Sequence, residues 1–316
     1  MRILGISCYF HDAAAALLDD GVLIAAAEEE RFSRIKHDFG FPERAIRFCL
    51  DKGGFVAADL DYVAFFEKPF VKFERILQTA LATVPRAHAV FRKAMTAWML
   101  DKLWVQSRIR DFVGVTADRI LFVEHHQSHA ASAFFCSPFE DAAILTVDGV
   151  GEWATATMGS GRGSSLTLDS EIRFPHSLGL LYSAFTAFLG FEVNEGEYKV
   201  MGMAPYGVPR YQDKVWKLID AAPDGAFALN LEYFSFHYSA TRTYSPHFES
   251  LFGATRKPET PFFTDTSRYP SYFGEKPANY RELAAENQHY ADLAASIQVV
   301  TRRFCCAWRP ASSRCS

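Results

Sequence analysis

Short runs of apolar residues, separated by polar turns, open the chain and predict β-strands. Asp19-Asp20-Gly21 stands between two of these runs, and an Asp-Gly pair favours the positive-φ conformation of a tight hairpin turn. A longer polar loop that contains His11 and Asp12 separates the first run from the second. The pattern therefore predicts a strand–loop–strand–turn–strand meander. Its strands are expected at residues 2–8, Ala13–Leu18 and Val22–Glu28.

Helical periodicity follows this meander. Pro42 suits the first turn of a helix, which is predicted at Glu43–Asp51 and is ended by Gly53-Gly54. The stretch 70–112 is predicted to be mostly helical, with a break near Pro85. Two more buried strands are expected at Tyr62–Phe66 and Ile120–Val123.

The same order of elements then occurs a second time. Three strand runs are separated by the acidic turn Asp148-Gly149-Val150-Gly151-Glu152 and by a turn at 159–163, and a helix is predicted at Leu180–Leu189. Two meanders, each followed by helices, indicate an internal duplication in an α/β protein, the layout of the actin-like ATPase superfold. In that superfold the two strand–turn–strand loops face each other across a cleft and hold the phosphates of a nucleotide. The strands of the second meander are expected at Ala142–Val147, Ala154–Met158 and Leu166–Phe174.

The duplication suggests a division of the chain into residues 1–124, a first half, and 125–301, a second half that is incomplete. Within the second half, residues 208–282 are rich in Pro, Tyr, Phe and Ser, and they are interpreted as an irregular insertion. A clear helix is predicted at Leu283–Val300, with an apolar stripe along one side. Residues 302–316 show neither apolar period nor turn signals and are interpreted as an aberrant tail, out of frame or truncated.

Three histidines lie within the five residues 125–129, between a predicted strand and a predicted helix. His125 and His129 are four residues apart, so on a helix both imidazoles reach one point. Asp148, at the end of an apolar strand, can add a carboxylate, and this ligand set suits Fe(II), Mn(II) or Zn(II). Most HxxxH pairs are not metal sites, but the end of a strand that enters a helix is where α/β proteins place ligands. His126 points elsewhere and is given a supporting or substrate-contacting role.

The composition excludes several classes of protein. The 316 residues are 49% hydrophobic and 22% charged, with a net charge of −4, so no basic surface for nucleic acid is expected. No run of residues is long and apolar enough for a membrane span, and the apolar run at the N-terminus is too short for a signal peptide. A cytoplasmic protein is expected.

These features resemble the N-terminal part of the NodU/CmcH-type O-carbamoyltransferases. The resembling stretches keep their order from the first residues to about residue 300 and are, together, specific to that family. They are Gly5-Ile6-Ser7 through His11-Asp12-Ala13-Ala14, the segment 28–38 (EEERFSRIKHD), the HHQSH run, Asp148 to Glu152, residues 177–182 (SLGLLY) and residues 195–207 (EGEYKVMGMAPYG).

The resemblance implies a reaction in which carbamoyl phosphate and ATP form carbamoyl adenylate, whose carbamoyl group passes to a hydroxyl of a sugar or an antibiotic. It assigns adenylation to a YrdC-like C-terminal domain, which is missing from this sequence. It assigns transfer to an actin-like domain related to the TsaD family of tRNA threonylcarbamoyl transferases, with iron as the usual metal. A homodimer is left open.

The resemblance also implies roles for single residues. His125, His129 and Asp148 would bind the metal, although a further family aspartate expected beyond the last helix is absent. His11 would be the general base, in agreement with the near-neutral pKa that such a base needs; the alternative is a loop histidine that binds Asp12. The ATP or carbamoyl adenylate would contact Lys36, Gly149, Gly151, Glu197, Lys199 and Gly202.

Two other interpretations stay open for the function: an actin-like kinase or ATPase, and a degenerate fragment without catalysis. Lys36 is otherwise a solvated charge beside Arg34, and the segment 196–202 is otherwise a plain turn. The stripe of the helix Leu283–Val300 is expected to lack a sheet that covers it. The chain by itself is therefore expected to be poorly soluble and without carbamoyltransferase activity, with a disordered or loosely packed tail.

Overall fold

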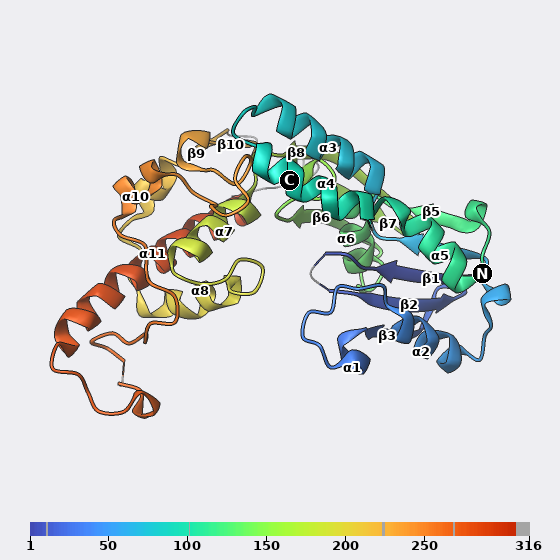
Figure 1. Ribbon diagram of the computed structural model, residues 1–316, viewed down its shortest axis with the longest axis horizontal. Helices are drawn as coiled ribbons and strands as arrows, with labels where there is room; N and C mark the ends of the chain where they lie inside the picture. The colour runs from blue at the N-terminus through green and yellow to red at the C-terminus, as the bar shows by residue number, and fades with distance from the viewer. Residues whose placement is uncertain (11, 101, 223–224, 268, 308–316) are drawn as a thin grey trace. The chain divides into compact units, whose positions relative to one another are not determined.

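The computed structural model describes residues 1–10, 12–100, 102–222, 225–267 and 269–307, which form two compact α/β units. The first unit comprises Met1–Phe139 and Gly151–Trp153, and the second comprises Glu140–Val150 and Ala154–Ser316 (Figure 1). The predicted division after residue 124 differs from this boundary, because the helix that follows residue 124 belongs to the first unit. Within the described residues, none of the helices is both long enough and apolar enough to span a bilayer.

A five-stranded sheet forms the first unit, in the order β3-β2-β1-β4-β5. The first three strands are an antiparallel meander, and β4 and β5 continue the sheet in parallel. The hairpin turn is confirmed, since Asp20 has φ 46° and Gly21 has φ 80°. This strand order is that of one half of the predicted actin-like fold. The strands are β1 (Arg2–Ser7), β2 (Ala14–Asp19), β3 (Val22–Glu28), β4 (Tyr62–Phe65) and β5 (Ile120–Phe122).

Helices cover one face of this sheet. The helix α2 (Glu43–Gly53) packs on β2 and β3, and α5 (Val105–Val113) packs on β5. Gly54 ends α2 with φ 68°, as its position after the last helical residue predicts. The remaining helices of the unit are α1 (Glu30–Ser33), α3 (Pro69–Ala82), α4 (His88–Leu100), α6 (His125–Phe134) and the short 3₁₀ helices η1 (Ala57–Asp59), η2 (Lys102–Trp104) and η3 (Ala117–Arg119).

The second unit repeats the meander as the antiparallel sheet β6-β7-β8, whose strands are β6 (Asp141–Val147), β7 (Ala154–Arg162) and β8 (Ser165–Arg173). The turn predicted at 159–163 is wrong, because β7 continues to Arg162 and the chain reverses at Gly163, which has φ 56°. Gly159 lies inside the strand, where an added Cβ would approach the Thr167 carbonyl to 1.9 Å. A separate two-stranded sheet pairs β9 (Ile219–Ala221) with β10 (Phe227–Leu229).

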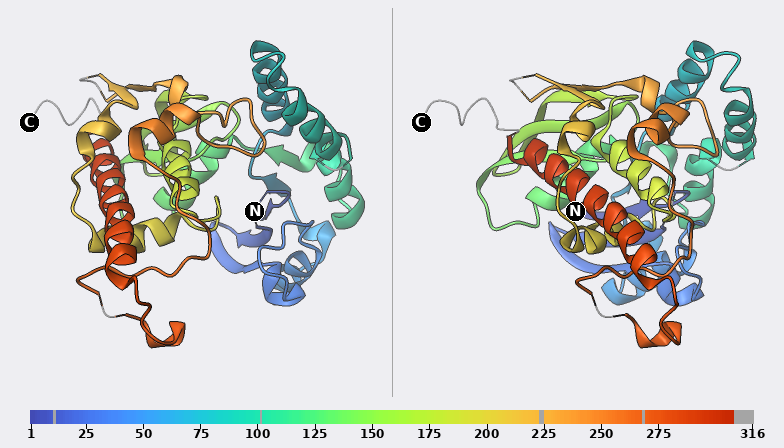
Figure 2. Two further views of the ribbon diagram at one scale, coloured as in Figure 1. Left: turned by 60° about the vertical axis from the view of Figure 1, so that its left-hand side comes forward. Right: turned by 90° about the vertical axis from the view of Figure 1, so that its left-hand side faces the viewer.

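The long helix α11 (Tyr280–Ala307), drawn in red in Figure 2, contributes many buried side chains to the core of the second unit. It packs against α7 (Leu178–Phe188), α8 (Glu197–Met203), η4 (Ala204–Tyr206) and α9 (Gln212–Trp216). The expectation of an uncovered stripe is therefore wrong. Tyr290, Leu293, Ile297 and Val300 are buried with aromatic side chains of α7 and of α10 (Pro246–Phe252).

The insertion predicted at 208–282 supplies many of the side chains that bury α11. Its lack of apolar periodicity gave no indication of this packing. Buried side chains from it include Val215, Phe227 and Phe248, and its other elements are η5 (Leu231–Tyr233) and η6 (Ser271–Phe273). The tail also differs from expectation as far as it is described. Residues 302–307 continue α11, and Phe304 packs on Trp216 with ring centroids 5.2 Å apart. Residues 308–316 lie outside the described residues.

Leu293→Ala tests whether α11 is covered as described. Leu293 is fully buried, so truncation should lower the free energy of unfolding by about 2–5 kcal/mol, because it removes apolar contacts and leaves a cavity. Urea unfolding monitored by circular dichroism measures the change. Leu81→Ala is the matched control, since Leu81 is a helical residue with 66% exposure and should change stability by less than about 0.5 kcal/mol. Equal effects of the two substitutions would mean that α11 is uncovered.

Candidate functional site

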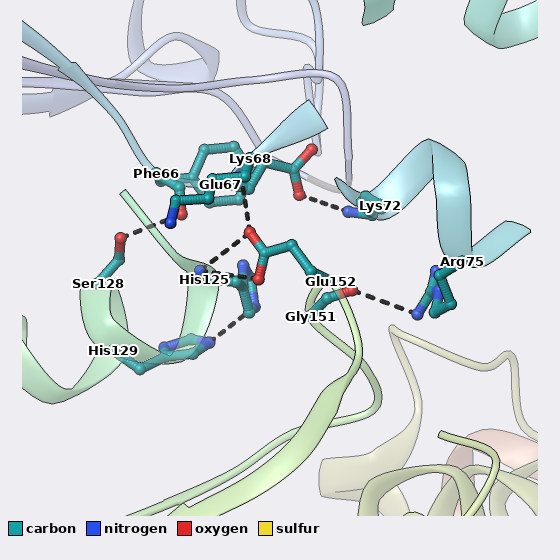
Figure 3. A network of polar contacts seen from close by, with 10 residues as sticks. All are labelled: Phe66, Glu67, Lys68, Lys72, Arg75, His125, Ser128, His129, Gly151 and Glu152. Carbon is teal, nitrogen blue, oxygen red and sulfur yellow. Dashed lines mark hydrogen bonds and ion pairs between the residues drawn. The ribbon is translucent and has the colours of Figure 1, made fainter. Parts of the chain in front are cut away.

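The helix α6 brings two of the predicted metal ligands together in the first unit. It begins at His125, separated from the end of β5 by two residues, and the four-residue spacing places His129 one turn later on the same side. The Nε2 atoms of His125 and His129 are 3.0 Å apart, and the two rings are nearly perpendicular at 89° (Figure 3). His125 is buried, at 7% exposure, while His129 is exposed.

This separation fits two ligands of one metal ion. Two nitrogens at about 2.1 Å from an ion and at a right angle to each other are about 3.0 Å apart. Right angles between neighbouring ligands occur in the octahedral geometry typical of Fe(II) sites with two histidines and one carboxylate. The imidazole pair of α6 is therefore suited to a divalent transition metal in the first unit.

Asp148 lies in the second unit, where it follows the end of β6. Its turn is fixed on the N-terminus of α7: the Ser177 hydroxyl lies 3.0 Å from the Asp148 carbonyl oxygen and 2.7 Å from that of Gly149. An added Cβ on Gly179 would approach the backbone of Asp148 to 2.5 Å, so only glycine permits this packing. The predicted approach of Asp148 to the two imidazoles, which belong to the other unit, stays a prediction.

The other end of the acidic turn belongs to the first unit. Gly151 packs against α6, where an added Cβ would lie 3.0 Å from Cβ of His125 and from Cδ2 of His126. The carboxylate of Glu152 accepts hydrogen bonds from the backbone N–H groups of His125 and Lys68. The sequence assigned Glu152 no role. Its place in an acidic turn was the one local signal, and the turn alone does not indicate which helix it contacts.

The first loop and the segment around Lys36 are joined to each other. His11, the predicted general base, lies outside the described residues. Its neighbour Asp12 contacts Nδ1 of His37 at 3.1 Å, and the His37 N–H donates to Glu30 at 3.0 Å. Lys36 is exposed on the same segment. The sequence did not single out His37, although it lies in the resembling segment 28–38; in the structure it adopts a left-handed φ of 54°.

The three residues predicted to contact a nucleoside share the short helix α8 in the second unit. Glu197 accepts hydrogen bonds from the Ser183 hydroxyl at 2.9 Å and from the Asn194 N–H at 3.1 Å, so its carboxylate stabilises the start of α8. Lys199 lines a cavity of about 640 Å³ with aromatic walls that include Phe191 and Tyr206. Gly202 faces open space, so a ligand could approach its backbone.

Comparison with known proteins places the whole described chain in one family. The sequence profile described as "Carbamoyltransferase N-terminus" matches residues 2–308. The uncharacterized protein sll1178 of Synechocystis sp. is 49% identical over 310 residues, which cover 96% of this chain and 46% of that protein. The nodulation protein NolNO of Sinorhizobium fredii is 36% identical over 230 residues, or 71% of this chain and 32% of NolNO.

Among solved structures, YeaZ from Pseudomonas aeruginosa is similar with 15% identity and a TM-score of 0.29, covering 54% of this chain and 64% of YeaZ. The chain spans less than half of the length of sll1178 and of NolNO. The profile match runs through both units, from the first strand to the end of α11. The chain therefore belongs to the carbamoyltransferase family and corresponds to its N-terminal part.

Proposed function

We propose that this chain performs the transfer step of an O-carbamoyltransferase. In that step a carbamoyl group passes from carbamoyl adenylate, made from carbamoyl phosphate and ATP, to a hydroxyl of a small molecule such as a sugar or an antibiotic. Family membership supports the carbamoyl chemistry. The observation that carries the proposal is the paired Nε2 atoms of His125 and His129, 3.0 Å apart at the start of α6.

In this proposal His125, His129 and Asp148 bind a divalent metal, Fe(II) being the expected ion. The polypeptide itself limits the span between them, because Asp148 is four residues from Glu152, whose carboxylate is bound to the His125 N–H. An extended chain covers at most about 3.6 Å per residue, so the Cα atoms of Asp148 and Glu152 are within about 14 Å. When bound, the metal would polarise the carbamoyl carbonyl or balance the charge of the departing phosphate.

The residues of the chain have distinct tasks in the transfer. The acceptor hydroxyl loses its proton to His11 as its oxygen bonds to the carbamoyl carbon, and the bond from that carbon to the phosphate oxygen breaks, which releases AMP. Lys36, with Gly149 and Gly151, is assigned to the phosphate. The helix α8 is assigned to the nucleoside through Glu197, Lys199 and Gly202. Lys199 lines the cavity of about 640 Å³, and Gly202 faces open space.

Formation of the adenylate is assigned to a YrdC-like domain outside this sequence. The chain was expected to be inactive because the apolar stripe of α11 would be exposed. This reason does not apply, because Leu293 and its neighbours are buried. The transfer step can therefore be tested on this chain directly, with carbamoyl adenylate supplied as the donor.

The test uses the chain loaded with Fe(II) under anaerobic conditions, carbamoyl adenylate and a panel of sugar and aminoglycoside acceptors. Mass spectrometry should detect the carbamoylated acceptor, and AMP should be released in equal amount. Phosphate release from ATP without a carbamoylated product would favour the kinase or ATPase instead. Absence of both reactions in the folded, metal-loaded chain would mean an inactive fragment.

A further inference from the structure

A group of buried charges lies beside the start of α6 in the first unit (Figure 3). Glu67, Lys72, Arg75 and Glu152 are each at most 7% exposed. Lys72 forms an ion pair with Glu67, and Nη1 of Arg75 donates to the Gly151 carbonyl at 3.2 Å. Buried ion pairs seldom add stability over apolar residues of the same size. The presence of these buried charges is therefore better explained by the backbone segment that they hold in place than by a gain in stability.

Glu152 is the member of this group that contacts the metal-binding helix. Its Oε1 accepts a hydrogen bond from the backbone N–H of Lys68 at 2.7 Å. Both of its carboxylate oxygens lie 3.1 Å from the backbone nitrogen of His125. The N-cap residue of α6, Glu124, makes no side-chain hydrogen bond to the first turn. Glu152 thus supplies from a distant part of the sequence the anionic cap that α6 lacks locally.

The charge of Glu152 is balanced within the cluster. Burial lowers the pKa of Arg75 to about 10, while the nearby carboxylates of Glu67 and Glu152 oppose this shift, so Arg75 stays a cation at neutral pH. Arg75 also holds the carbonyl of Gly151, the residue before Glu152. Gly151 in turn lies so close to His125 that a Cβ would be only 3.0 Å from it. The segment is therefore fixed against α6 at its backbone and at its carboxylate.

We propose that Glu152 is the positioning residue of the metal-binding helix. By capping the His125 N–H it holds the first turn of α6, so the Nε2 atoms of His125 and His129 keep their 3.0 Å spacing before any metal arrives. The phenyl ring of Phe66 packs edge-on against His125 at 5.6 Å, and the Ser128 hydroxyl donates to the Phe66 carbonyl at 3.0 Å, so the same turn has a second support. The proposal rests on the metal site of the proposed function.

The test titrates the chain with Co(II), whose visible absorption reports ligand number and geometry. Glu152→Ala should weaken Co(II) binding by about 10–100-fold and change the absorption bands, as loss of an outer support of metal ligands does. Glu152→Gln keeps an acceptor oxygen for the two N–H groups and should lose less. Glu124→Gln is the matched control, because Glu124 directly precedes α6 but its side chain is 57% exposed and pairs with Lys68.

Amide hydrogen exchange separates this inference from the proposed function. Exchange in the first turn of α6 should be faster in Glu152→Ala than in Glu124→Gln, with or without metal. If the unaltered chain binds no Co(II), the metal site is wrong, while the exchange data still decide whether Glu152 holds the helix. Should Glu152→Ala not fold, Glu152→Gln replaces it, with weaker Co(II) binding than Glu124→Gln expected. Equal exchange and equal Co(II) affinity in the Glu152 and Glu124 variants would overturn the inference.

Discussion

Replacing His129 with alanine is expected to remove most of the binding of Fe(II) or Co(II) by this chain, which is itself expected to be weak because a further family aspartate is absent. The substitution removes one of two imidazole nitrogens that lie 3.0 Å apart, and the remaining His125 cannot hold the ion at a comparable affinity. Loss of an outer partner of a metal ligand costs about 10–100-fold in affinity, so loss of a ligand itself should cost more. Co(II) titration by absorption spectroscopy, with metal analysis after gel filtration, measures the effect.

The control for this experiment is His88→Ala. His88 is an exposed histidine at the start of α4, so it presents the same chemical change away from α6. Asp148→Asn extends the test to the third proposed ligand and should also weaken binding, since an amide oxygen is a poorer ligand than a carboxylate for these ions. If His129→Ala bound metal as tightly as His88→Ala, the pair on α6 would be a hydrogen-bonded pair of imidazoles and not a metal site.

His11→Asn is expected to slow carbamoyl transfer by about 10²–10⁴-fold, the usual cost of losing a general base. Asparagine preserves much of the size and polarity of the side chain but cannot accept the proton of the acceptor hydroxyl. The measurement is the rate of carbamoylated product formed from carbamoyl adenylate at saturating acceptor. Metal binding should be unchanged, because the predicted ligands lie in α6 and after β6.

His37→Asn is the informative comparison for His11. His37 contacts Asp12, the residue after His11, at 3.1 Å, and it sits beside Lys36 on the same segment. If His37→Asn slowed transfer as much as His11→Asn, the proton transfer would depend on both histidines and not on His11 alone. Transfer at the unaltered rate in His11→Asn would remove His11 from the mechanism.

Much of the fold follows from local patterns. The hairpin at Asp20-Gly21 and the end of α2 at Gly54 depend on backbone conformations that a few neighbouring residues decide. The pairing of His125 with His129 is equally local, because helix geometry alone brings residues four apart to one side. Such features can be predicted from sequence, since the atoms that determine them are close along the chain.

Other expectations failed for a common physical reason. The cover of α11 comes from α7, α10 and the aperiodic stretch 208–282, and a sequence without periodicity does not indicate which helix it will bury. The turn at 159–163 failed because glycines usually mark turns, whereas Gly159 is required by the close approach of the Thr167 carbonyl in the neighbouring strand. Both outcomes depend on residues that meet only after folding.

Sequence patterns alone predicted the duplicated meander, the α/β class, the family and the two histidines that share one side of α6. Each of these rests on spacing, on turn chemistry or on motifs in a fixed order. That Glu152 caps α6 and that α11 is buried became visible in the folded chain alone, because contacts such as His125 with Glu152 and Trp216 with Phe304 join residues far apart in the sequence. Burial and capping between residues far apart in the sequence depend on how whole helices and strands pack. An apolar pattern indicates that a helix must be buried, but not which other element will bury it.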